Sequence, residues 1–412
     1  MSQVFGHTLL NPIGTSAGID KGAEIPDQLL LLGPAYVEVG GITPLPQEGN
    51  SKPRLFRVVS QSALVNRFGL NSEGCDRVAM RLRKRVREYA YAMGYGIDEA
   101  AERKILDGEA GVPPGSLVKG KLMAIQIAKN KTTPENVEAI ERDYVYCVEK
   151  LSKYADVIVV NVSSPNTENL RDLQRQEPLT KILRGVVGAA IRTDRRTKPA
   201  ILVKVSPDED SREQVEGICE AVWDSGVDGV IVGNTTKRRP NPLPTGTKLS
   251  ETEAAIMLEQ GGYSGPQLFE RTVSLVKRYR RILDRSLDGR RLAASQGNDI
   301  QSHSREEGYN IIEASIDRDT SNLKTSDNAS TQPLIHLPER HTSSTDASDT
   351  SGAHALSTSN YNEQSSNADT VVSSPAREPV RKVIFCSGGI TNGKQALEVL
   401  NAGADLIQIY TA

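Results

Sequence analysis

The chain has 412 residues, which is long enough for one large domain or two ordinary ones. Hydrophobic residues make up only 37% of it, a low share for a globular protein of this length, so part of the chain is expected to lie outside any core. The formal net charge of -2 argues against a generally nucleic-acid-binding surface.

The cysteines and the chain start also narrow the class. The four cysteines, Cys75, Cys147, Cys219 and Cys386, show no CxxC spacing, so neither a disulfide framework nor a zinc site is indicated, and a reducing compartment fits. No apolar run approaches the roughly 18 residues that a membrane helix needs. The first residues lack a basic region followed by an apolar stretch, so no targeting signal is visible.

Eight short apolar runs recur along the chain and are predicted to be strands. In chain order they are Ile13–Ala17, Tyr36–Gly40, Leu122–Ile127, Val157–Asn161, Ile201–Val205, Val230–Asn234, Val383–Ser387 and Leu406–Tyr410. Most of these runs are continuously apolar rather than alternating. Such continuity is typical of strands that are covered on both faces.

Helical apolar spacing lies between most of these runs. The predicted helices are a short one at Pro26–Leu32, and then Glu135–Lys153, Pro178–Arg192, Arg212–Ser225, Gln267–Leu283 and Asn392–Ala402. Alternating strands and helices indicate parallel βα units, and eight strands favour a closed (β/α)8 TIM barrel. A doubly wound sheet is the alternative, but its GxGxxG fingerprint is missing after the first strand.

Two intervals are too long for plain βα connections. The first, after the second strand, holds a hairpin-like stretch around Pro53–Gly74 and a helix near Glu73–Met93. The basic residues of this helix are expected to form a solvated face, with a membrane-surface contact as the alternative. The second interval is rich in Ser, Thr, Asp and Asn and cannot offset its ordering entropy by burial. We therefore predict a barrel of residues 1–285 and 380–412, with residues 286–379 as a disordered insertion between the sixth helix and the seventh strand.

The polar residues at the strand ends carry the chemistry in a barrel, because active sites lie at that face. Lys204 lies inside the otherwise apolar strand Ile201–Val205, where an unpaired ammonium is costly. Two explanations stay open: a salt bridge to a carboxylate of a neighbouring strand, or a bound anionic cofactor or intermediate. Gly388-Gly389, after the seventh strand, would let the backbone approach a phosphate, with a plain turn as the alternative.

The histidines help by exclusion. All of them except His7 fall in the low-complexity interval, and His7 precedes the first strand. The barrel therefore offers no obvious histidine base and no His/Cys/carboxylate metal cluster. Catalysis would use Ser, Lys, Cys or a carboxylate, together with an organic cofactor.

A series of motifs then points to one family. They are Asn11-Pro-Ile-Gly, Ala17-Gly-Ile-Asp-Lys21, Val37-Glu-Val-Gly40, Pro46-Gln-Glu-Gly-Asn50, Pro53-Arg-Leu-Phe-Arg57, Asn66-Arg-Phe-Gly, Asn71-Ser-Glu-Gly74, Asn161-Val-Ser-Ser-Pro-Asn166, Gly233-Asn-Thr-Thr236, Gly261-Gly-Tyr-Ser-Gly265 and Ser387-Gly-Gly389. With these motifs the chain resembles the class 2 dihydroorotate dehydrogenases, the quinone-linked mitochondrial kind. The resemblance runs from about Gly6 to Ala412 apart from the insertion. The long insertion and some of the glycines resemble those of fungal members.

The resemblance implies an FMN bound at the C-terminal face of the strands. The residues that would contact FMN are Ser16, Ala17, Gly18, Ile19, Asp20, Asn161, Lys204, Gly265, Gly389, Tyr410 and Thr411. Lys21 would pair with the carboxylate of the substrate. The other substrate contacts would be Asn66, Arg67, Phe68, Gly69, Leu70, Asn161, Asn166, Asn234 and Thr235.

The implied reaction is the oxidation of dihydroorotate to orotate in pyrimidine (UMP) biosynthesis. Ser164 would be the catalytic base that removes the C5 proton. The cytosolic classes place Cys there, so Ser164 favours ubiquinone as the electron acceptor. Arg57 and Tyr410 match positions near the family's quinone tunnel. The implied location is the mitochondrial inner membrane, attached through an N-terminal segment missing from this chain.

Some positions depart from the family pattern, namely Gly41, Phe68, Leu70, Gln126 and Gly233, and each departure costs at most a contact or two. The family's membrane helix, its two quinone-entry helices and its last barrel helix would lie beyond the ends of this chain. We therefore expect a fragment with weakened stability and weakened FMN retention. Two other hypotheses are a related FMN barrel with another electron acceptor and an inactive truncated remnant.

Overall fold

A computed structural model describes residues 2–163, 173–243, 246, 248–313 and 380–411. Eight parallel strands close into a barrel in the order β10-β12-β13-β3-β4-β7-β8-β9. They are β3 (Ile13–Thr15), β4 (Tyr36–Ile42), β7 (Leu122–Ile127), β8 (Val157–Asn161), β9 (Ala200–Val205), β10 (Gly229–Val232), β12 (Val383–Ser387) and β13 (Leu406–Ile409). The prediction of a (β/α)8 barrel is confirmed, and the doubly wound alternative is wrong.

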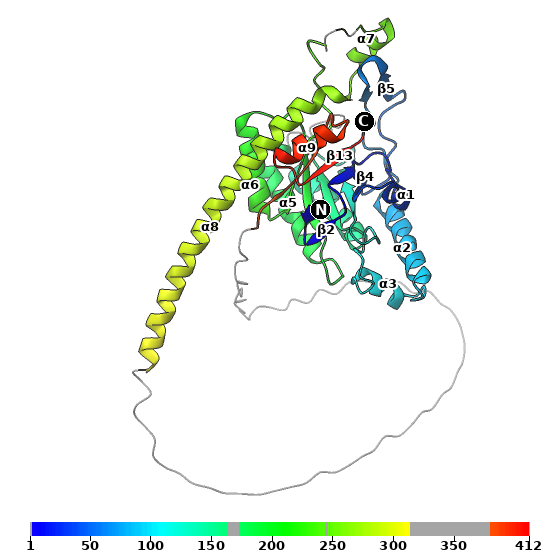
Figure 1. Ribbon diagram of the computed structural model, residues 1–412. Helices are drawn as coiled ribbons and strands as arrows, with labels where there is room; N and C mark the ends of the chain where they lie inside the picture. Colours follow the sequence, from blue (N-terminus) through cyan, green and yellow to red (C-terminus); the bar gives the residue numbers. More distant parts are fainter. Residues whose placement is uncertain (1, 164–172, 244–245, 247, 314–379, 412) are drawn as a thin grey trace, which may run out of the picture. The chain divides into compact units, whose positions relative to one another are not determined.

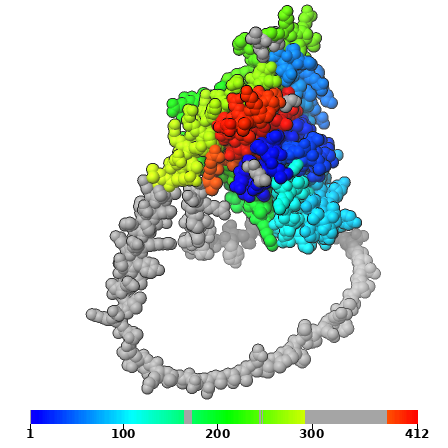
Figure 2. Space-filling view, in the orientation of Figure 1, coloured from blue at the N-terminus to red at the C-terminus, as the bar shows by residue number. Residues whose placement is uncertain are grey.

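The last strand closes the barrel against the first. β13 pairs with β3 in parallel register, with Ile407 opposite Ile13 and Ile409 opposite Thr15. Figure 2 shows the consequence at the surface, where N-terminal residues in blue lie beside C-terminal residues in red. Closure brings the ends of the first and last strands to the same rim.

The helices that alternate with the barrel strands lie around them, whereas α7 (Glu251–Leu258) packs against β5 (Leu55–Val58) outside the barrel (Figure 1). The other helices are α1 (Pro26–Leu31), α2 (Cys75–Ala92), α3 (Glu99–Leu106), α4 (Val137–Leu151), α5 (Gln176–Ile191), α6 (Arg212–Ser225), α8 (Phe269–Glu313) and α9 (Gly393–Asn401). Capping residues explain where helices begin and end, as α6 illustrates. Ser211 and Gln214 form a capping box at the start of α6, and Gly226 ends that helix in the left-handed conformation.

Two apolar layers account for the continuous strand runs. Alternate strand residues point into the barrel, where Tyr36 packs edge-on against Phe385 with ring centroids 5.1 Å apart. The other strand residues meet the surrounding helices. An N-terminal hairpin that the sequence analysis missed, β1 (Ser2–Val4) with β2 (His7–Leu9), adds Val4 and Leu9 to the inner layer.

A three-stranded antiparallel sheet lies outside the barrel. It joins β5 (Leu55–Val58) and β6 (Ala63–Asn66), which form the predicted hairpin, to β11 (Gly262–Ser264). The third strand comes from nearly 200 residues further along the chain. This long-range pairing places Asn66 opposite Gly262.

The basic side chains of helix α2 do not form the simply solvated face that the sequence predicted. The helix is amphipathic as predicted, with Val78, Leu82 and Val86 buried. Several of its basic side chains, however, are ion-paired. Arg85, only 11% exposed, lies 2.6 Å from a carboxylate oxygen of Asp27. None of the helices in the described part of the chain combines the length and apolar character needed to cross a membrane.

The predicted insertion begins differently in the structure. Residues 286–313 continue α8 as helix, whereas the sequence analysis expected disorder from residue 286. The chain separates into two compact units, one of residues 1–290 with 379–412 and one of residues 291–378. Residues 314–379 lie outside the described residues, so the rest of that prediction stays a proposal.

Candidate active site

A cavity opens at the C-terminal ends of the barrel strands, with about 1010 Å³ of empty space that includes its open mouth. That volume is at the upper end of the range for cofactor and ligand pockets. The predicted site residues that line it are Ser16, Ala17, Gly18, Lys21, Asn66, Phe68, Gly69, Leu70, Asn161, Lys204, Asn234, Thr235, Gly265, Gly389, Tyr410 and Thr411. The strand ends therefore bring together residues from every region of the barrel sequence.

Lys21 is a cation that faces this cavity. Its ammonium lies 4.7 Å from the ring centroid of Phe68, and no carboxylate pairs with it among the described residues. Burial, followed by the positive charge of Arg54, lowers the pKa of Lys21 to about 8. An anion bound beside Lys21 would offset both effects, so this end of the cavity is suited to a carboxylate ligand.

Lys204 forms a buried ion pair with Glu38. Its Nζ lies 3.0 Å from Glu38 Oε1 and 3.0 Å from Ser16 Oγ, and the two charged side chains are 3% and 0% exposed. The amides of Gln126 and Gln408 also donate to the Glu38 carboxylate. Four elements of the barrel therefore meet at one buried charge pair.

This pair resolves one of the alternatives left open for Lys204. The predicted salt bridge is present, but its carboxylate is on β4, which is not a neighbour of β9 in the barrel. Lys204 also lines the cavity, so the salt bridge does not exclude a role beside a bound anion. Burial and the Glu38 charge raise the pKa of Tyr36, whose hydroxyl lies 3.4 Å from that carboxylate.

A chain of amide and hydroxyl contacts fixes the end of β8. Asn161 donates to Gln126 Oε1 at 2.7 Å and accepts from Ser163 Oγ at 2.8 Å. Asn234, at the end of β10, donates to Ser163 Oγ at 2.8 Å. Two strand ends are thus joined through one serine, and their amides have defined orientations.

Gln126 occupies space that Gly41 leaves open. A Cβ atom on Gly41 would lie 3.2 Å from Gln126 Oε1 and 3.3 Å from a methyl carbon of Leu70. Both Gly41 and Gln126 line the cavity. Gln126 therefore reaches the site, and these two departures from the family pattern accommodate each other.

Gly388 and Gly389 lie against the first turn of α8. Both have positive φ, at 133° and 73°. A Cβ on Gly389 would lie 2.4 Å from the backbone nitrogen of Phe269, and one on Gly388 would lie 2.7 Å from Thr272 Oγ1. A glycine turn beside a helix N-terminus is a favourable place for a phosphate group.

Several predicted residues do not line the cavity. Ile19 is 43% exposed, and Asp20 uses its carboxylate to accept the backbone N–H groups of Glu24 and Ile25 before α1. Arg67 turns toward Glu259, with which it forms an ion pair. The structure thus gives these three side chains other surroundings than the cavity wall.

Two further predicted residues, Ser164 and Asn166, lie outside the described residues. The sequence analysis missed other cavity residues, namely Ser264, Leu268, Ile390, Gln408 and Ile409, and it missed Glu38 beneath them. A signal for Glu38 existed, because it is a carboxylate inside an apolar strand, as Lys204 is an ammonium inside one. No group of three metal-ligating side chains occurs among the residues whose placement is described.

Comparison with known proteins shows the family to which the chain belongs. The family model described as Dihydroorotate dehydrogenase matches residues 1–288. The mitochondrial dihydroorotate dehydrogenase (quinone) of Lachancea kluyveri is 41% identical over 276 residues, which cover 64% of this chain and 56% of that protein. The protein of the same name from Schizosaccharomyces pombe is 38% identical over 269 residues, covering 65% of this chain and 57% of that protein.

A solved structure is also similar. The crystal structure of DHODH from Eimeria tenella in complex with ferulenol matches with a TM-score of 0.63 and 25% identity, covering 100% of this chain and 78% of that one. The chain spans little more than half the length of the curated relatives that it matches.

Proposed function

Because the chain belongs to the dihydroorotate dehydrogenase family, we propose that it forms the FMN-binding barrel of an enzyme that oxidises dihydroorotate to orotate in pyrimidine biosynthesis. The observation that carries the proposal is the cavity at the strand ends, which holds Lys21, with no anionic partner among the described residues, and Lys204 beside its buried counter-ion. The first suits a carboxylate substrate, and the second suits an anionic cofactor.

The residues present fit an FMN. The Gly388-Gly389 turn leaves no room for side chains and lies beside the start of α8, as a phosphate site requires. Gln408 lines the cavity with a buried Oε1 that has no partner among the described residues, so a ligand donor could use it. The residues proposed to hold the cofactor from the cavity wall are Ser16, Ala17, Gly18, Asn161, Lys204, Gly265, Gly389, Tyr410 and Thr411. FMN, when bound, supplies the acceptor for a hydride.

Lys21 and the amide side chains would bind the pyrimidine. The Lys21 ammonium pairs with the substrate carboxylate and regains the charge stabilisation that burial removes. Asn66, Asn161 and Asn234 present both amide donors and carbonyl acceptors, which match the alternating donors and acceptors of the ring. Phe68 and Leu70 cover it with apolar surface.

Ser164 is proposed as the base for the C5 proton. A serine is a weak base in water, so it depends on exact placement and a proton path. The preceding residue, Ser163, is fixed by Asn161 at 2.8 Å and by Asn234 at 2.8 Å. These contacts would anchor the start of the segment that carries Ser164.

The electron acceptor and the location are proposals that rest on the relatives. Several are named dihydroorotate dehydrogenase (quinone), mitochondrial. We infer that ubiquinone reoxidises the cofactor and that the protein works at the mitochondrial inner membrane. Attachment to the membrane through an N-terminal segment is part of this proposal.

Flavin bleaching tests the proposal. The full chain, mixed with FMN and dihydroorotate without oxygen, should lose its yellow absorbance, and a quinone analogue should restore it. Bound FMN that dihydroorotate does not bleach would refute the activity. Restoration by fumarate or NAD, but not by the quinone analogue, would refute the acceptor.

A variant tests the base. Ser164→Ala should stop bleaching while orotate still shifts the flavin spectrum, because the serine moves a proton but does not hold the ring. Unchanged bleaching would refute the role of Ser164.

A further inference from the structure

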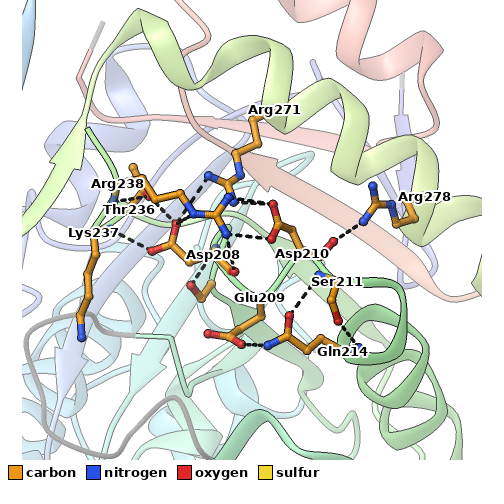
Figure 3. Close-up of polar contacts among 11 residues, drawn as sticks. Asp208, Glu209, Asp210, Ser211, Gln214, Thr236, Lys237, Arg238, Arg271 and Arg278 are labelled. Atoms are coloured by element: carbon orange, nitrogen blue, oxygen red, sulfur yellow. Dashed lines mark hydrogen bonds and ion pairs between the residues drawn. The ribbon is translucent and has the colours of Figure 1, made fainter. Parts of the chain in front are cut away.

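An ionic cluster lies at the loop that joins β9 to α6 (Figure 3). Asp208 and Asp210 on this loop meet Arg238, which follows β10, and Arg271 on α8. None of these four residues lines the cavity. The cluster joins the loop after β9 and α8 to the segment after β10, of which Asn234 and Thr235 line the cavity.

Asp208 is the buried member of the cluster. Its side chain is 7% exposed, whereas that of Asp210 is 32% exposed. The Asp208 carboxylate accepts the hydroxyl of Thr236 and, at 2.9 Å, the backbone N–H of Lys237. Arg271 lies 3.7 Å from it. Asp208 therefore holds the segment after β10 at two successive residues, through the side chain of Thr236 and the backbone of Lys237.

Thr236 transmits this hold to the cavity wall. It directly follows Asn234 and Thr235, both of which line the cavity. Its backbone exchanges hydrogen bonds of 3.0 and 2.7 Å with Tyr263, in the small sheet that also carries Asn66. Thr236 is thus the point where the barrel and the small sheet are tied together.

Asn234 extends the same path to β8. Its amide donates to Ser163 Oγ at 2.8 Å, and Ser163 in turn bonds Asn161. A shift of the β10 segment would therefore misplace both asparagines that face the ring. Small displacements of groups that orient a substrate have large effects on binding and rate.

We propose that Asp208 is a positioning residue for the pyrimidine end of the cavity, acting through the hydroxyl of Thr236. The inference rests on the proposed function, because it assigns Asn234 and Thr235 to the substrate. It concerns the pyrimidine and not the flavin phosphate, which is assigned to the Gly388-Gly389 turn. The competing explanation is an ordinary surface ion-pair network with no effect on the site.

Asp210 provides the matched control. It lies on the same loop and makes a bidentate pair with Arg238 at 2.9 and 3.0 Å, and it lies 2.5 Å from Arg271. Its side chain does not contact Thr236 among the described contacts. Asp210→Asn removes one negative charge from the same arginines, so any difference from Asp208→Asn reports on the bonds to the β10 segment.

Orotate binding to the FMN-loaded full chain, measured by the shift of the flavin spectrum, separates the explanations. Asp208→Asn replaces the charge-assisted hydrogen bonds to the Thr236 hydroxyl and the Lys237 N–H with weaker neutral ones. We expect the dissociation constant for orotate to rise about tenfold. The FMN dissociation constant should stay within about twofold, and Asp210→Asn should match the wild type in both measurements.

Substitutions of Thr236 test the path. Thr236→Val should weaken orotate binding as Asp208→Asn does, and Thr236→Ser, which keeps the hydroxyl, should restore it. In the double variant Asp208→Asn/Thr236→Val the two losses of orotate affinity should not add, because both substitutions act on the bond between Asp208 and the Thr236 hydroxyl. Equal losses from Asp208→Asn and Asp210→Asn, or additive losses, would overturn the inference.

Failure of the inference is distinguishable from failure of the function. Wild-type protein that binds FMN but neither orotate nor dihydroorotate removes the function, and the inference with it. If the wild type binds orotate and Asp208→Asn binds it with the same affinity, the inference alone is refuted. If Asp208→Asn fails to fold, Thr236→Val against Thr236→Ser decides the same question.

Discussion

Removing the carboxylate of Glu38 should destabilise the barrel strongly. Glu38→Gln leaves the Lys204 ammonium without a counter-ion at 3.0 Å, in a position where the two side chains are 3% and 0% exposed. It also turns one acceptor oxygen into a donor that faces the amide of Gln126 or Gln408. Breaking a buried pair in this way costs about 3–5 kcal/mol. That is a large part of the roughly 5–15 kcal/mol that stabilises a native protein.

Urea unfolding and thermal unfolding, both followed by circular dichroism, measure this loss. For a chain of this size we expect the thermal midpoint to fall by about 10 °C. Glu138→Gln is the control, because Glu138 pairs with Lys181 on the surface and its removal should leave the midpoint unchanged. The double variant Glu38→Gln/Lys204→Met removes both charges and should recover part of the loss. A Glu38→Gln protein within about 1 kcal/mol of the wild type would refute the reasoning.

Other predictions follow from single residues. The pKa of Lys21 is lowered from 10.5 to about 8, so its charge is lost as the pH rises through 8. Orotate binding should weaken as the pH rises above 8. Lys21→Met should bind orotate weakly at every pH, and a dissociation constant that depends on pH in the variant as it does in the wild type would contradict this. Gly389→Ala puts a Cβ 2.4 Å from a backbone nitrogen of α8 and should release FMN, measured by fluorescence. Gly393→Ala, with nothing within 4 Å, should retain it, and equal retention by both would oppose the phosphate assignment. Arg290 and Lys382 both lie over the ring of Trp223, so the barrel segments on either side of residues 291–378 lie close together. Replacing residues 291–378 with a short linker should therefore leave the thermal midpoint of the barrel unchanged. A barrel that no longer melts cooperatively would contradict that.

The strands were predictable from the sequence because their signal is local. A strand covered on both faces must be apolar at every position, and this holds at Tyr36–Val39 except for Glu38. The composition of the long interval predicted an insertion that begins at residue 286, and the boundary between the two compact units falls at residues 290 and 291. The continuation of α8 to Glu313 was missed, because polar composition does not exclude a helix.

The position of the site was also predictable, since polar residues at strand ends meet at one face of a parallel barrel. Their orientations were not. Arg67 and Phe68 are adjacent in the sequence, yet Phe68 lines the cavity while Arg67 pairs with Glu259. Their surroundings depend on β11, which pairs with β6 across nearly 200 residues.

The sequence by itself determined the barrel, the family resemblance and the two lysines that a ligand would meet. Only the tertiary structure decided which groups stand opposite them. Glu38 meets Lys204 because closure of the sheet brings β4 and β9 across one interior, and Asp208 meets Thr236 because neighbouring strand ends lie together. Such pairings arise between residues far apart in sequence, and their register is set by packing of the whole barrel rather than by local pattern.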